Sequence, residues 1–221
     1  MRFFMPIFLL LFSYTAQANF NISPLSQSIS IKDKSASYTL ENLTNKKAAY
    51  EIKVASRILD QNGKELRDET KEIRVFPSKV ILEPQQKKRI KVIYLGKKGI
   101  TQEKAFRVVF MQLDRDVTEQ DQQTFNAKFN FHTAFYVTPV GAKSDLTAQI
   151  THENTKAQLT LVNQGNKHVI LQDWNLKLAT DSESQMYQHK LPDINMLASS
   201  RVIIPLEGVN TRFSQVDIVQ E

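Results

Sequence analysis

Cysteine is absent from the 221-residue chain, which also has only six glycines and one tryptophan. Without cysteine no disulfide can form, and the absence of thiolate ligands argues against a structural zinc site. The few glycines form no Gly-rich phosphate loop, and no Gly-x-Ser-x-Gly elbow presents a nucleophile. After residue 18 no stretch approaches the roughly 20 apolar residues of a membrane-spanning helix. We therefore expect a fold that is held together by apolar burial alone, without membrane insertion.

The polar residues give no pattern of catalysis. The four histidines are far apart in the sequence and match no metal-binding spacing. Acidic residues gather between positions 114 and 121, but they lie among glutamines and beside Arg115. That composition is typical of a solvated loop rather than of a pair of carboxylates for acid–base work. We expect a protein that is not an enzyme and that holds no metal or cofactor.

The first 18 residues have the features of a signal peptide. Arg2 supplies a positive charge, residues 3–12 form an apolar run, and Ala16-Gln17-Ala18 has the small-x-small pattern of a cleavage site. We therefore expect residues 1–18 to be removed and an exported protein to begin at Asn19. The net charge of +6 favours acidic partners or carboxylates without naming one, and export makes nucleic acid an unexpected partner.

The first half of the remaining chain has the periodicity of β-strands. Residues 37–43, 49–58, 89–95 and 105–113 alternate in polarity and are rich in β-branched and aromatic side chains. Turn-forming residues separate them at intervals that are typical of an antiparallel sandwich. The pattern predicts an N-terminal immunoglobulin-like domain over residues 19–139.

A second domain is predicted after a break in this pattern. Pro139 and Gly141 interrupt the alternation, which starts again at Leu146. Further strands are expected over residues 146–150, 157–162, 168–178, 200–206 and 215–219. The chain is therefore predicted to be all-β, with a smaller immunoglobulin-like sandwich over residues 143–221.

The segment from residue 125 to residue 137 is a long amphipathic strand with an apolar face of odd-numbered positions. These positions include Phe125, Ala127, Phe129, Phe131, Thr133 and Phe135. The apolar face fits two interpretations, which remain open at this point. As the last strand of a sandwich, the segment would pack its apolar face into its own core. As an exposed strand, it would need a partner to prevent aggregation, and it would add to the incomplete sheet of another protein.

Three motifs in this order resemble the periplasmic chaperones of the chaperone–usher pathway, in a divergent form like the archaic or alternate branches. They are Arg74–Pro84, Glu103–Phe110 and Leu159–Val169. The resemblance implies two immunoglobulin-like domains in a boomerang arrangement in the periplasm. It implies that the strand before the linker binds, folds and caps pilus subunits by donor-strand complementation, before delivery to an outer-membrane usher. Phe125, Ala127, Phe129 and Phe131 would be the donor residues, with Thr133 and Phe135 continuing the same face. Self-association through this strand is a further expectation.

The chain departs from the family at the site that binds the carboxylate end of a subunit. Well-known members use an arginine in the first strand and a lysine late in the seventh. Here residues 20–27 contain no arginine, and Thr133 and Ala134 stand in the region of the lysine. A carboxylate in a partly desolvated cleft still needs charge-assisted donors. Arg89 and Arg107 are the candidates, against the alternative that each faces solvent or pairs with a surface acid.

Two other functions remain open. A pilus subunit or adhesin would carry a strongly alternating extension at its mature N-terminus, and residues 19–31 alternate poorly. A general extracellular two-domain binding module would differ from a chaperone in whether the strand over residues 125–137 is exposed. The sequence identifies neither the subunit nor the usher, and it does not fix the oligomeric state of the free protein.

Overall fold

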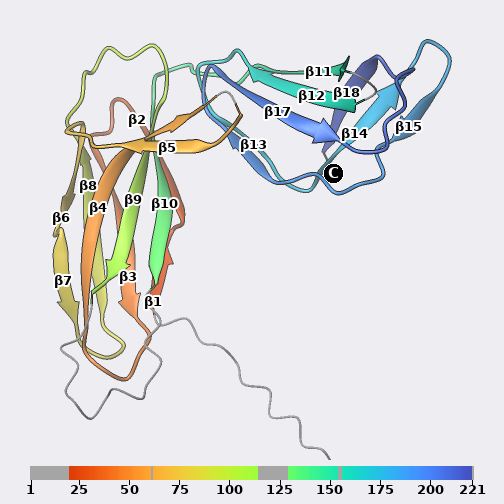
Figure 1. The fold of residues 1–221 in the computed structure, drawn as a ribbon. Coiled ribbons are helices and arrows are strands. Elements are labelled where there is room, and N and C mark those ends of the chain that lie inside the picture. The colour runs from red at the N-terminus through yellow and green to blue at the C-terminus, as the bar shows by residue number, and fades with distance from the viewer. Residues whose placement is uncertain (1–19, 61, 114–128, 154–155, 221) are drawn as a thin grey trace, which may run out of the picture.

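The computed structural model describes residues 20–60, 62–113, 129–153 and 156–220, and all regular structure in these ranges is β-strand. The strands form two sandwiches that meet at an angle, so the protein has the shape of a boomerang (Figure 1). The predicted all-β class and boomerang arrangement are confirmed. Within the same ranges we find no helix with the length and apolar character needed to cross a membrane. The proposed signal peptide lies outside the described residues.

In the described residues, the first sandwich contains ten strands in two sheets. They are β1 (Phe20–Ser23), β2 (Ser26–Ser30), β3 (Ser35–Asn42), β4 (Ala48–Leu59), β5 (Glu65–Asp68), β6 (Ile73–Phe76), β7 (Lys79–Leu82), β8 (Lys87–Tyr94), β9 (Lys104–Gln112) and β10 (Asn130–Thr138). One sheet has the order β1-β3-β8-β6, and the other has the order β2-β10-β9-β4-β5, with β7 also paired to β4. The N-terminal segment therefore contributes one strand to each sheet.

The core of this sandwich follows from the period of two in its strands. Alternate residues of β8 and β9 face the opposite sheet, because successive side chains of a strand point to opposite faces. Ile90, Val92, Phe106, Val108 and Phe110 are all buried in this way. Strands β8 and β9 thereby each contribute one apolar face to a single core, as their alternating sequences predict.

The second sandwich is smaller and is built around Trp174. Its strands are β11 (Leu146–Glu153), β12 (Lys156–Asn163), β13 (Val169–Leu171), β14 (Trp174–Ala179), β15 (Ser184–Met186), β16 (Ile194–Met196), β17 (Ser200–Leu206) and β18 (Gln215–Gln220). They form the sheets β11-β12-β17, β15-β14-β18 and β13-β16. Trp174 is buried in the core, and its indole N–H donates to the carbonyl oxygen of Pro192 at 2.9 Å.

The predicted length of one strand in this domain is wrong. Residues 168–178 were predicted to form a single strand, but the structure has β13 and β14 there, paired in different sheets. The chain turns at Asp173, whose φ of 47° is in the left-handed region. An aspartate tolerates this conformation better than most residues do, so the turn interrupts a stretch whose apolar content is continuous.

The linker between β10 and β11 contains Pro139 and Gly141. The division of the chain into an N-terminal domain over residues 19–139 and a C-terminal domain over residues 143–221 remains a proposal. Hydrogen bonds attach this linker to the β12–β13 turn. The backbone N–H of Asn166 donates to the carbonyl oxygen of Lys143 at 2.9 Å, and that of Gln164 donates to the carbonyl oxygen of Asp145 at 2.7 Å. The linker is thus fastened to the second domain where the two sandwiches meet.

Candidate functional site

Strand β10 is paired along its whole length on one side but only partly on the other. Strand β9 pairs with residues 130–137, whereas β2 pairs in parallel only with residues 134–138. Within the described ranges, no strand covers the outer side of residues 130–133, which we call the open edge. The backbone N–H of Ala134 donates toward β2, and the carbonyl oxygen of Phe129 accepts from β9. By the period of two, Asn130 and His132 direct their backbone groups to the open edge.

The odd-numbered side chains of β10, together with Phe129 directly before it, divide into an exposed end and a buried end. Phe129 is 38% exposed, and Phe131 is half-buried with its ring edge-on to Phe20 at 4.6 Å between centroids. Thr133 and Phe135 are completely buried, and the Thr133 hydroxyl donates to the carbonyl oxygen of Val108 at 3.0 Å.

Thr133 and Phe135 therefore have no exposed surface in the free protein, and their place among the donor residues stays a prediction. Their side chains stabilise their own domain, because β2 closes the edge of the sheet beside them and the core encloses them. At this end of the strand the apolar face packs into the core of its own domain, which is the first of the two interpretations of the sequence. Phe125 and Ala127 lie outside the described residues, so Phe129 and Phe131 are the donor candidates that the structure places.

A second feature is a group of three arginines around one carboxylate, which we call the arginine cluster: Arg57 of β4, Arg67 of β5 and Arg107 of β9, with Glu65 of β5. Glu65 Oε2 accepts from Arg57 Nε at 2.7 Å, and Glu65 Oε1 accepts from Arg67 Nε at 2.6 Å. Arg107 donates Nε to Oε1 at 2.9 Å and Nη2 to Oε2. Both oxygens of Glu65 therefore accept two charge-assisted hydrogen bonds each.

The charges in the cluster determine its protonation. Burial alone would raise the pKa of Glu65, but the hydrogen bonds from Arg107, Arg67 and Arg57 outweigh burial and lower this pKa to about 2. The carboxylate of Glu65 also raises the pKa of Arg107. His132 of β10 lies at the rim, where its Nδ1 accepts from Arg67 Nη1 at 2.8 Å. Burial and the charges of Arg67 and Arg107 lower the pKa of His132, so the rim favours a neutral imidazole.

The arginine cluster lies where the first domain meets the second. The Arg57 guanidinium donates to the hydroxyl of Tyr136 and to the side-chain and backbone oxygens of Asn195 in the second domain. The β4–β5 hairpin extends toward that domain (Figure 1), and its Gly63 lies against Val202. In the register of the sheet, Arg107 is opposite Ala134, directly beyond the open edge.

The two predicted arginines lie in different sheets of the first sandwich. Arg107 belongs to the cluster, where it is paired with an acid. Arg89 lies on β8 in the other sheet, opposite Thr39, and its side chain is exposed. The structure therefore does not bring Arg89 to Arg107, and each of them stays a predicted candidate for binding the carboxylate. Sequence reasoning missed Arg57. By the period of two, Arg57 shares the face of β4 that carries Glu51 and Lys53, and this pattern could have marked it as part of a polar face.

A buried carboxylate fixes the joint between the domains. Glu103, whose side chain is 1% exposed, accepts from the backbone N–H of His168 at 2.9 Å and from the Thr138 hydroxyl at 2.6 Å. Its Oε1 is also 2.6 Å from His168 Nδ1. The imidazole of His168 stacks on the ring of Tyr136 with 3.9 Å between centroids. Burial raises the pKa of Glu103, but the bonds from His168 and Thr138 outweigh burial and lower it.

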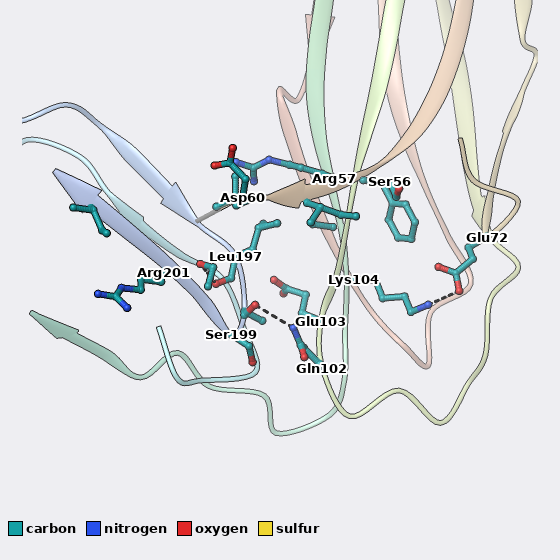
Figure 2. A pocket seen from close by; sticks show the side chains of 17 residues that line it. Ser56, Arg57, Asp60, Glu72, Gln102, Glu103, Lys104, Leu197, Ser199 and Arg201 are labelled. Carbon is teal, nitrogen blue, oxygen red and sulfur yellow. Dashed lines mark hydrogen bonds and ion pairs between the residues drawn. The ribbon is translucent and has the colours of Figure 1, made fainter. Parts of the chain in front are cut away.

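A cavity of about 770 Å³ lies beside this joint, between the end of the first sandwich and the β16–β17 turn (Figure 2). Its labelled side chains include Asp60 and Glu72 as well as Lys104 and Arg201. Lys104 is paired with Glu72, and Gln102 donates to the carbonyl oxygen of Ala198 at 3.0 Å. Charges of both signs line the cavity, so its lining selects no single class of ligand.

A scan of the sequence against models of protein families gave no match, and a search of the curated proteins gave no similar sequence. Solved structures are similar in fold. The class 5 fimbriae chaperone CfaA has a TM-score of 0.65 at 18% identity, with 92% of this chain and 93% of that chain covered. A chain from the CsuC–CsuE chaperone–tip adhesion subunit complex of Acinetobacter baumannii has a TM-score of 0.64 at 16% identity, with 91% and 97% covered.

A third similar structure is that of the Salmonella enterica SafA pilin in complex with the SafB chaperone. It has a TM-score of 0.60 at 12% identity, with 93% of this chain and 98% of that chain covered. These likenesses extend over both sandwiches. The protein therefore has a two-domain, immunoglobulin-like fold similar to that of these fimbrial chaperones.

Proposed function

We propose that the protein is a periplasmic chaperone that binds, folds and caps pilus subunits and passes them to an outer-membrane usher. The observation that carries the proposal is the open edge of β10, where two phenylalanines stand next to unpaired backbone groups. A strand edge of this kind is a template for another chain. The fold supports the proposal, because similar structures include chaperones in complex with a pilin or a tip adhesin.

The mechanism is the completion of an incomplete sheet. A strand of the subunit pairs with the backbone of Asn130 and His132, while Phe129 and Phe131 fill its apolar groove. Phe125 and Ala127 extend this face in the proposal. No covalent step or nucleotide is involved. The subunit gains main-chain hydrogen bonds and apolar burial, and the usher releases it when another strand replaces β10.

We further propose that Arg107, together with Arg57 and Arg67, binds the C-terminal carboxylate of the subunit. These arginines lie just beyond the end of the open edge, on the side of the second domain. Guanidinium groups bind carboxylates with paired, charge-assisted hydrogen bonds. The site would fix the end of the subunit strand and thereby its register along β10.

The proposal is tested by periplasmic co-expression with the pilin-like proteins that are encoded beside this chain. The chain is purified by affinity, and the subunits that accompany it are identified by mass spectrometry. We expect recovery of a stoichiometric subunit with the wild-type protein and its loss with Phe129→Asp. Phe76→Asp is the matched control, because Phe76 is 72% exposed on the other sheet and far from the open edge in the topology.

Three outcomes would contradict the proposal. Recovery of the chain alone, with the subunits soluble in its absence, would favour a general two-domain binding module. Circular dichroism that shows an unfolded Phe129→Asp variant would return Phe129 to the core of its own domain. Detachment of an N-terminal extension of this chain during assembly would instead support a role as a pilus subunit or adhesin.

A further inference from the structure

Glu65 has the bonding that a bound carboxylate would have. Its two oxygens take the Nε donors of Arg57, Arg67 and Arg107, and Arg107 adds Nη2 to complete a two-point pair. A planar guanidinium offers such a two-point face to one carboxylate at a time. The side of Arg107 that binds carboxylates best is thus already occupied by the chain itself.

The cluster needs an anion whether or not a subunit is bound. The side chain of Arg57 is 5% exposed. It cannot lose its positive charge by deprotonation, because arginine keeps its proton in proteins. A buried charge that loses its partner is costly, and three guanidinium groups in contact would also repel one another. Glu65 removes both problems in the free protein.

The strand that carries Glu65 is weakly held. Strand β5 has only four residues, and within the part of the chain that the structure describes it pairs only with β4, at the edge of its sheet. Leu66, Arg67 and Asp68 are exposed, so the strand adds no side chain to the core. Segments with little apolar burial open at low free-energy cost. Withdrawal of Glu65 would therefore leave the core of the sandwich intact.

We propose that Glu65 fills the carboxylate site of the free protein and that the C-terminal carboxylate of a subunit replaces it. This inference rests on the proposed function, and it adds that Glu65 competes with the subunit. The competition sets the affinity of the site for carboxylates. Before binding, Glu65 compensates the charges of the arginines, and another carboxylate enters only if the pairing along β10 holds it in place. A carboxylate without such pairing does not displace Glu65.

The first test uses the full chain and acetate, without a subunit. Glu65→Ala leaves three arginines without their carboxylate, and acetate is expected to take its place. At constant ionic strength, replacing chloride by acetate should raise the midpoint of thermal unfolding of Glu65→Ala by roughly 2–4 °C, since a ligand stabilises the state that binds it. The wild-type protein should show no such rise.

The matched control is Glu51→Ala. Glu51 is a partly buried carboxylate on the same sheet with two cationic neighbours, Lys53 and Lys79, and among the described residues no arginine is paired with it. An equal acetate effect in Glu51→Ala and Glu65→Ala would overturn the proposal, as would no effect in Glu65→Ala.

If Glu65→Ala does not fold, Glu65→Gln keeps the shape and acceptor oxygen of the side chain. Acetate binding is then followed through the NMR signals of the arginine Nε–H groups. We expect Glu65→Gln to bind acetate at least tenfold more tightly than the wild-type protein, and equal affinities would overturn the proposal. Neither acetate assay contains a subunit, so the two proposals can fail separately. If acetate binds as expected but no subunit is recovered with the wild-type protein in the co-expression experiment, the chaperone function is rejected and the carboxylate site remains supported.

Discussion

Replacing Glu103 by alanine removes the carboxylate that joins the two domains. Its oxygens accept from the Thr138 hydroxyl in the first domain and from the backbone N–H of His168 in the second, and they contact His168 Nδ1. Other contacts across the joint remain, such as those of Gln102 with Ala198 and of Arg57 with Asn195. We therefore expect both sandwiches to stay folded while the angle between them becomes variable.

The magnitude follows from the burial of the carboxylate. Removing one partner of a buried, hydrogen-bonded charge costs about 3–5 kcal/mol. His168 is 12% exposed and stays stacked on Tyr136, so the lower end of this range applies, about 3 kcal/mol. Tenfold in an equilibrium constant corresponds to about 1.4 kcal/mol, which makes the undocked state roughly 100-fold more populated. Glu103→Gln keeps an acceptor for His168 and should lose only about 1 kcal/mol.

Small-angle scattering and calorimetry measure the two consequences. Glu103→Ala should have a larger radius of gyration than the wild-type protein and should unfold in two separated steps. The control is Glu183→Ala, which removes an exposed ion pair with Arg212 and should leave both measurements unchanged. If Glu103→Ala has the scattering profile and single transition of the wild-type protein, the joint does not depend on this carboxylate and the reasoning is refuted.

Three further predictions concern stability. The lowered pKa of Glu65, from 4.5 to about 2, means that the stabilisation from its carboxylate is fully present above pH 4.5 and is lost as the pH falls to about 2; urea unfolding of Glu65→Gln across this range should lack that loss. Gly165→Ala should destabilise the joint by at least about 1 kcal/mol in thermal unfolding, because a Cβ there would be 2.3 Å from the carbonyl oxygen of Lys143. Phe135→Ala should cost about 3–5 kcal/mol in urea unfolding, whereas Phe129→Ala should cost less than half as much; equal losses would contradict the division of β10.

The alternating strands were predictable because each buries one face. The sequence patterns over residues 89–95 and 105–113 became β8 and β9 with the expected side chains in the core. The same rule could not predict which end of β10 is buried and which end is exposed. Phe129, directly before β10, and Phe135, within it, share the odd-numbered apolar face, but only Phe135 lies in the part of the strand that pairs with β2 and is enclosed by the core. That pairing joins residues more than 100 positions apart, and a local pattern does not contain it.

The arginine cluster shows a different limit. Arg89 and Arg107 both stand on predicted strands, and the strand pattern gives them equal weight. Their separation follows from the sheet order, which places β8 and β9 in different sheets. Arg57 and Glu65 meet through the β4–β5 hairpin, and Asn195 reaches Arg57 from the second domain. Charged residues on a surface are common, so only the tertiary structure distinguishes this group from solvated side chains.

The positions of the open edge and the arginine cluster determine the direction of a bound strand. The edge spans residues 130–133, and Arg107 is opposite Ala134 at its end nearer the second domain. A subunit strand whose C-terminal carboxylate reaches Arg107 must therefore run from residue 130 toward residue 133, parallel to β10. Strand β2 already pairs in parallel from Ala134 onward, so the subunit strand would continue the same arrangement.

Because the chain has no cysteine, single cysteines at Asn130 and His132 can report this direction by cross-linking. A cysteine near the C-terminus of the subunit should form a disulfide with His132→Cys in preference to Asn130→Cys, since the two positions are about 7 Å apart along the strand. Preferential cross-linking to Asn130→Cys would mean an antiparallel strand. The carboxylate would then lie at the far end of the edge, out of reach of Arg107, and the arginine cluster could not be its binding site.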